Sequence, residues 1–72
     1  MKFAIVNATN EEFPRVQDVT EGNDPQQALA DWYAGPGGRV MRHPKIYAQP
    51  YESLTPELRE SYEDRYGSPL GN

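Results

Sequence analysis

One segment of the chain, residues 24–35, shows apolar residues at helical spacing more clearly than any other. The residues that share this apolar face are Ala28, Leu29, Trp32 and Tyr33. Apolar positions three and four apart lie on one side of an α-helix, so the segment is predicted to be an amphipathic helix. It contains the only tryptophan of the chain, and we expect Leu29 and Trp32 to form core that the other elements cover.

Signals for the start and the end of a helix flank the same segment. Asp24 can cap the helix by accepting hydrogen bonds from backbone N–H groups, and Pro25 suits the first helical position. Gly35 can adopt the left-handed conformation that ends a helix, and Pro36 prevents its continuation. The sequence therefore predicts a helix that begins after Asp24 and ends at Gly35.

Strand patterns precede this helix. Residues 2–7 include a continuous apolar run, Phe-Ala-Ile-Val, which predicts a strand with both faces at least partly covered. A second strand is predicted over residues 13–20, antiparallel to the first through the turn-forming residues 7–10. Val16 and Val19 are three positions apart rather than two, so we expect a bulge or an irregular end in the second strand.

A second helix is predicted near the end of the chain. Thr55 can cap it and Pro56 suits its first position, while Gly67 marks its end. Arg59 can form an ion pair with Glu63, one turn later. Its narrow apolar stripe, at a spacing of four residues, is formed by Leu58, Tyr62 and Tyr66.

The elements together predict an α+β domain. Residues 39–43 and 45–49 favour two short strands around Pro44, or one strand that the proline interrupts. The expected order is then β-β-α-β-β-α, a small antiparallel sheet with two helices packed on one face. We expect residues 1–67 to form a single domain and residues 68–72 to form a flexible C-terminal tail.

Composition narrows the possible chemistry. The 72 residues include no cysteine, which excludes disulfides, thiolate catalysis and cysteine-based zinc sites. The apolar run near the start is too short for a signal peptide or a membrane span, so we expect a cytoplasmic protein. The net charge is −4, with residues 1–31 at −4, residues 32–51 at +3 and residues 52–72 at −3. An acidic surface repels nucleic acid and favours association with basic proteins.

The sequence offers no pattern of catalytic residues. The only histidine, His43, lies among Arg39, Arg42 and Lys45, with no acid close in sequence that could orient it as a base. These cations disfavour its protonated form, and a turn position before Pro44 explains it without catalysis. We therefore predict a protein that is not an enzyme.

No metal or cofactor site is expected either. The carboxylates of Glu57, Glu60 and Asp64 diverge from one exposed helix face, without the loop that would bring oxygen ligands together. The glycine-rich stretch at residues 35–38 follows a helix, whereas a phosphate-binding loop follows a strand and precedes a helix. A solvent-exposed acidic face and a loop account for both features.

The second helix is the predicted site of partner binding. It combines acidic residues with tyrosines, which are typical anchors of protein interfaces. The residues assigned to this site are Glu57, Glu60, Tyr62, Glu63, Asp64 and Tyr66. Tyrosines that expose only their hydroxyl groups remain the alternative explanation. We expect a partner with a basic surface, such as a nucleic-acid-handling protein that this chain inhibits by stoichiometric occlusion.

A basic stretch supports an alternative function, direct binding of RNA or DNA. Cations with interleaved aromatic residues suit single-stranded nucleic acid, and the residues concerned are Arg39, Arg42, Lys45 and Tyr47. The same cations could neutralise the acidic helices of the protein itself. A structural subunit of a phage particle or a larger complex is a further alternative, and the oligomeric state is left open.

The start of the chain resembles a known family. The opening Met-Lys-Phe-Ala-Ile-Val and the segment at residues 20–30, Thr-Glu-Gly-Asn-Asp-Pro-Gln-Gln-Ala-Leu-Ala, are similar to the opening of HicB-type antitoxins. This resemblance implies a protein that binds and neutralises a small RNA-cleaving toxin. Small acidic inhibitors encoded by phages are similar in size and charge.

Overall fold

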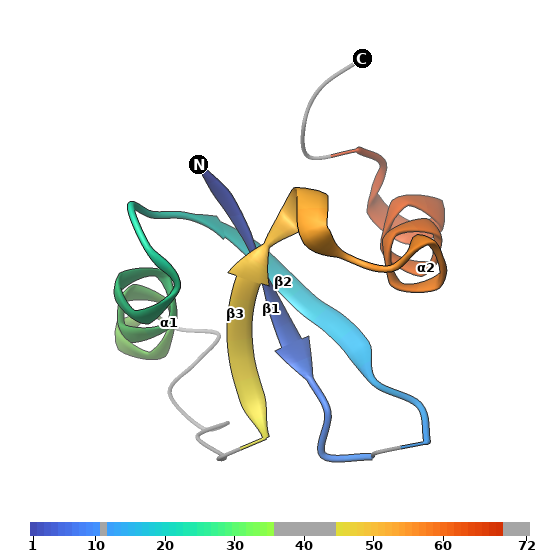
Figure 1. Ribbon diagram of the computed structural model, residues 1–72, viewed down its shortest axis with the longest axis horizontal. Coiled ribbons are helices and arrows are strands. Elements are labelled where there is room, and N and C mark those ends of the chain that lie inside the picture. Colours follow the sequence, from blue (N-terminus) through green and yellow to red (C-terminus); the bar gives the residue numbers. More distant parts are fainter. Residues whose placement is uncertain (11, 36–44, 69–72) are drawn as a thin grey trace.

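The computed structural model describes residues 1–10, 12–35 and 45–68, and three of its elements are strands of one antiparallel sheet (Figure 1). The elements are β1 (Lys2–Asn7), β2 (Arg15–Glu21), α1 (Pro25–Ala34), β3 (Ile46–Pro50), a short 3-10 helix η1 (Tyr51–Ser53) and α2 (Pro56–Tyr66). The strand order is β2-β1-β3, so the strand that comes first in the chain lies at the centre of the sheet.

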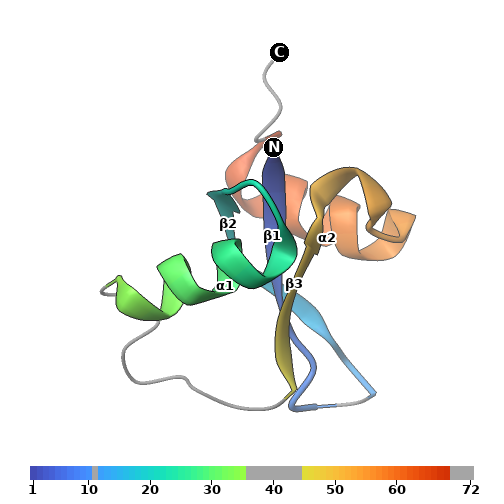
Figure 2. The same cartoon turned by 60° about the vertical axis from the view of Figure 1, so that its left-hand side comes forward.

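The two helices cover opposite faces of this sheet, which lies between them in Figures 1 and 2. On the α2 side the buried core residues are Ala4, Val6, Tyr51 and Leu54. On the α1 side they are Ile5, Trp32 and Ile46. Successive residues of β1 thus point alternately to the two helices, as the pleat of a strand requires.

The prediction that both helices pack on one face is therefore wrong. β1 is apolar on both faces, because its four central residues are all hydrophobic and all buried. One helix can cover only one of these faces, so a second helix is needed on the other side. The α+β class and the antiparallel sheet are confirmed.

The predicted element order is also wrong, since the described residues follow the order β-β-α-β-α. The strand expected at residues 39–43 lies outside the described residues. The strand expected at residues 45–49 is present as β3, one position later, and the chain then forms η1, which the sequence did not predict.

The pairing of β1 with β2 confirms both the antiparallel arrangement and the bulge. Ile5 lies opposite Asp18, whereas the next residue, Val6, lies opposite Val16. The register skips Gln17, which is the extra residue on β2. This shift brings Val16 and Val19, three positions apart, to the same core cluster.

Both helices begin as their sequences predict. The Asp24 carboxylate accepts a hydrogen bond from the Gln27 backbone N–H at 2.8 Å, and the Gln27 side chain accepts one from the Asn23 N–H at 3.2 Å. The second bond differs from that of a capping box, because Gln27 accepts from the residue before the cap rather than from Asp24 itself. At the start of α2, the Thr55 hydroxyl oxygen lies 3.4 Å from the Leu58 backbone nitrogen that donates to it.

The two helix ends differ from each other. Gly67 follows α2 with φ at 81°, a left-handed value that favours glycine. Gly35 follows α1 with φ at −84°, so the predicted left-handed conformation is wrong at this residue. Its N–H still donates to the carbonyl oxygen of Trp32 at 3.1 Å, which closes the last turn.

Candidate interaction site

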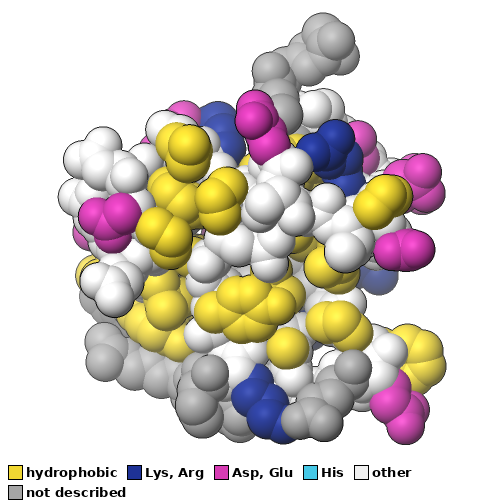
Figure 3. Space-filling view, in the orientation of Figure 1, with side chains coloured by type: hydrophobic (Ala, Val, Ile, Leu, Met, Phe, Trp, Pro, Cys, Tyr) yellow, Lys and Arg dark blue, Asp and Glu magenta, His cyan; other side chains and the backbone are white. Residues whose placement is uncertain are grey.

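The side of α2 that points away from the sheet carries three acidic residues. Leu58 and Tyr62 pack against the core, so the opposite side of this helix faces solvent. Glu57, Glu60 and Asp64 are all exposed there, and we call these three residues the acidic face. Within the described part of the chain, none of their carboxylates has a hydrogen bond or an ion pair. Figure 3 shows acidic side chains along the right-hand side, over α2.

Glu63, the fourth predicted acidic site residue, is engaged inside the protein. It is half-buried, and its carboxylate accepts a hydrogen bond from the Tyr51 hydroxyl at 2.5 Å. Burial and this hydrogen bond raise the pKa of Tyr51 to about 12. Glu63 therefore positions α2 against η1 and has a structural contact that the sequence did not predict.

The two predicted tyrosines of the site, Tyr62 and Tyr66, form a series with Tyr51 that runs from the core to the surface. Tyr51 is fully buried, and its ring meets that of Tyr62 edge-on, with centroids 6.2 Å apart. Tyr62 is half-buried and contacts Tyr66, with centroids 4.9 Å apart. Tyr66 is 68% exposed, so it is the tyrosine of α2 that a partner can reach most fully.

Arg59 packs beside the same buried tyrosine. Its guanidinium carbon lies 5.6 Å from the centre of the Tyr51 ring, and its Nη2 donates to the Glu52 carbonyl oxygen at 3.2 Å. Its buried Nε has no hydrogen-bond partner among the described residues. The predicted Arg59–Glu63 ion pair is thus replaced by separate contacts of both side chains around Tyr51.

A groove separates α2 from the connection between β1 and β2. Its volume is about 540 Å³. One wall includes Phe13, from the connection, and Arg15, the first residue of β2. The other wall includes the α2 residues Glu57, Leu58 and Arg65. Phe13 is 72% exposed although it is a large apolar residue. The groove therefore places an exposed aromatic side chain beside the first residue of the acidic face.

The alternative basic site is described only in part. Arg39, Arg42 and His43 lie outside the described residues. Lys45 and Tyr47 are both exposed at the start of β3, where the Lys45 carbonyl oxygen accepts a hydrogen bond from the Ala8 N–H at 2.9 Å.

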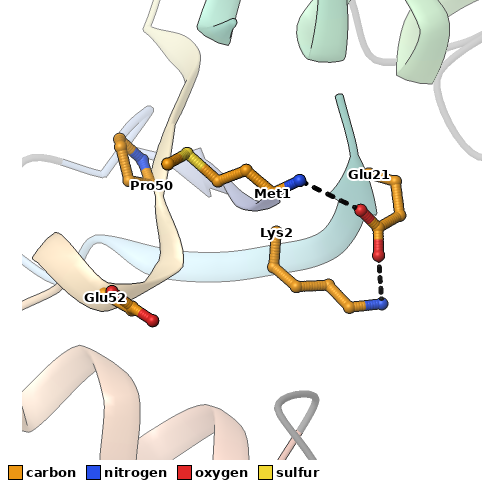
Figure 4. Close-up of a pocket in the computed structure, with 5 residues that line it drawn as sticks. All are labelled: Met1, Lys2, Glu21, Pro50 and Glu52. Carbon is orange, nitrogen blue, oxygen red and sulfur yellow. Dashed lines mark hydrogen bonds and ion pairs between the residues drawn. The ribbon is translucent and has the colours of Figure 1, made fainter. Parts of the chain in front are cut away.

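Another hollow, of about 370 Å³, lies beside the start of β1 (Figure 4). The carboxylate of Glu21 is bound there by Lys2 Nζ at 2.9 Å and by the amino group of Met1 at 3.3 Å. The hydrogen bonds from Lys2 and from this amino group lower the pKa of Glu21. These ion pairs join β1 to the end of β2, whereas Glu52, which also lines the hollow, forms no ion pair with a described residue.

Two further properties concern the described residues alone. They contain no group of three or more histidine, aspartate or glutamate side chains placed to hold a metal ion. Neither of their α-helices has the length and apolar composition needed to cross a membrane.

No protein-family model, curated protein or solved structure matches this chain. The likeness to HicB-type antitoxins is therefore a resemblance of residues 1–6 and 20–30 only.

Proposed function

We propose that this protein is a non-enzymatic binding module that inhibits a basic, nucleic-acid-handling protein by stoichiometric occlusion. The observation that carries the proposal is the acidic face, where Glu57, Glu60 and Asp64 are exposed on one side of α2. These carboxylates form no ion pair or hydrogen bond with a described residue, so they remain available to a binding protein of opposite charge.

Electrostatic and apolar features support the same face. The net charge of −4 favours encounter with a positively charged surface and raises the association rate. Phe13 lies across the groove from Glu57, so an exposed aromatic residue borders the acidic face. Aromatic residues within a charged surround are typical of protein interfaces.

The partner can be identified by affinity capture from a lysate of the native host, with and without nuclease. The proposal predicts a basic protein that is retained in a one-to-one ratio after nuclease treatment and whose activity on nucleic acid is lost when it is bound. Recovery of nucleic acid alone, abolished by nuclease, would contradict the proposal and favour the basic stretch of Arg39, Arg42, Lys45 and Tyr47.

The contact face is tested with the captured partner and two charge-matched variants. Replacing Glu60 and Asp64 by lysine reverses two charges of the acidic face, and we expect the affinity to fall by at least about tenfold. The control replaces Asp31 and Glu52, which are exposed elsewhere, by lysine and causes the same change in net charge. Equal loss in both variants would show that only net charge matters and would remove the acidic face from the proposal.

A further inference from the structure

Residues from β2, α1 and α2 line a hollow of about 350 Å³, which we call the aromatic pocket. The lining residues are Gln17, Asp18, Trp32, Tyr62 and Tyr66. β2 is an edge strand, and its bulge lies at Gln17. The two helices lie on opposite sides of the sheet (Figure 2), so both can contribute side chains at this edge.

Asp18 supplies an oriented negative charge to the aromatic pocket. Its Oδ2 accepts a hydrogen bond from the indole Nε1–H of Trp32 at 3.0 Å, and its Oδ1 accepts one from the Val19 backbone N–H at 2.8 Å. Both donors are neutral, and Asp18 has no ion pair with a described residue. Each carboxylate oxygen can accept a further hydrogen bond, so the charge is fixed in place and still available.

Three aromatic side chains line the pocket with this carboxylate. The ring centroids of Tyr62 and Tyr66 are 4.9 Å apart, with their planes tilted by 42°, and Trp32 lies beside Asp18. Tyr62 and Asp18 line the same hollow, and burial, followed by the charge of Asp18, raises the pKa of Tyr62. The faces of aromatic rings carry partial negative charge and attract cations.

We infer that the aromatic pocket binds an arginine side chain of the basic partner. Asp18 is exposed, and its negative charge attracts a cation and repels an anion. A guanidinium group is planar and can stack on a tyrosine ring while its N–H groups bind a carboxylate. The inference rests on the proposed function, since it names the side chain that the partner would insert at the β2 edge, on the side of α2 away from the acidic face.

The pocket can be tested without the partner, using a blocked glycyl-arginyl-glycine tripeptide as the probe. Trp32 is the only tryptophan of the chain, so its indole N–H gives a single signal in a nitrogen-edited NMR spectrum. We expect this signal to shift and saturate as the peptide is added. The control peptide contains citrulline, a neutral analogue of arginine of nearly the same shape, and should bind at least about tenfold more weakly. No saturable shift, or equal shifts with both peptides, would overturn the inference.

Two variants and two matched controls locate the binding. Tyr66→Ala should weaken binding of the arginine peptide by about threefold to fivefold, and Asp18→Asn by about tenfold. Phe13→Ala removes an aromatic ring of similar exposure outside the pocket, and Glu52→Gln removes one exposed negative charge that does not line the pocket. Both controls should bind the peptide as the parent protein does. Because Tyr66 is largely exposed, its variant should stay folded, and unchanged binding by it would overturn the inference.

The two proposals fail in different ways. If the arginine peptide does not bind but the Glu60 and Asp64 variant still loses its partner, only the aromatic pocket is disproved. If the peptide binds at the pocket but reversal of the acidic face leaves partner affinity unchanged, the assignment of the acidic face is wrong and the pocket remains.

Discussion

The hydroxyl group of Tyr51 donates a hydrogen bond to the carboxylate of Glu63, with 2.5 Å between the two oxygens. This contact joins η1, directly after β3, to the third turn of α2. It fixes the helix that carries the acidic face relative to the sheet, because the Tyr51 ring is itself fully buried in the core. The stability of the fold and the orientation of the candidate site therefore depend on the same side chain.

Removing the Tyr51 hydroxyl should destabilise the protein. Tyr51→Phe keeps the ring but leaves the half-buried Glu63 carboxylate without its donor, so we expect a loss of about 1–2 kcal/mol in the free energy of unfolding. Urea denaturation measures this quantity. Tyr66→Phe, which removes an exposed hydroxyl, is the control and should cost less than about 0.5 kcal/mol. Equal losses for the two variants would contradict the structural role of the Tyr51–Glu63 bond.

Alkaline pH should weaken the fold through the same tyrosine. The folded-state pKa of Tyr51 is about 12, above the ordinary value of 10.0, so the folded protein holds this proton more tightly than the unfolded chain does. The resulting stabilisation is complete below pH 10.0 and is lost as the pH rises toward 12. Over this window the free energy of unfolding should fall by at most about 1.4 kcal/mol per pH unit because of Tyr51 alone. Denaturation curves at several alkaline pH values should show a shallower fall for Tyr51→Phe, and identical slopes would contradict the prediction.

The carboxylate of Glu21 should report on the ion pairs at the start of β1. Its pKa is lowered by Lys2 first and then by the amino group of Met1. The stabilisation from these contacts is thus present at neutral pH and is lost as the pH falls through the lowered pKa. In Lys2→Met the pKa of Glu21 should move upward, toward its ordinary value of 4.5, which an NMR titration can follow. An unchanged Glu21 pKa would show that Lys2 does not hold this carboxylate in solution.

Gly22 should tolerate a side chain poorly, for a packing reason. A Cβ atom at this position would lie 2.9 Å from the Cβ of Ala28, a fully buried residue of α1. We expect Gly22→Ala to lower the free energy of unfolding by about 1–3 kcal/mol. Gly35→Ala is the control, because the nearest atom to its Cβ would be 3.5 Å away and its φ of −84° suits any residue. A Gly22 variant as stable as the Gly35 variant would disprove the close approach of α1 to the turn after β2.

The local elements were predictable from the sequence because their signals are local. The capping residues Asp24 and Thr55 lie within three positions of the N–H groups that they bind. The bulge in β2 was visible as the irregular spacing of Val16 and Val19. The apolar run in β1 predicted two covered faces, but only the alternation of its residues between the two core clusters shows which helix covers which face.

The contacts around the candidate site were not predictable in this way. Helical spacing indicated that Glu57, Glu60 and Asp64 share an outward face, and their exposure agrees with it. The spacing could not show that Glu63 is bound by Tyr51, 12 positions earlier, or that Asp18 is bound by Trp32, 14 positions later. Such contacts depend on how the strands and helices pack, and no local pattern encodes them.

The central position of β1 has a consequence for the order of folding. β2 follows β1 after a connection of seven residues, whereas pairing with β3 joins Asn7 to Ile46 and Phe3 to Pro50. Closing this longer loop costs more chain entropy, so we expect the β1–β2 hairpin to form early and β3 to dock late. Until α1 and α2 dock, both apolar faces of β1 are open to other chains. Refolding at high protein concentration should therefore compete with aggregation through this strand.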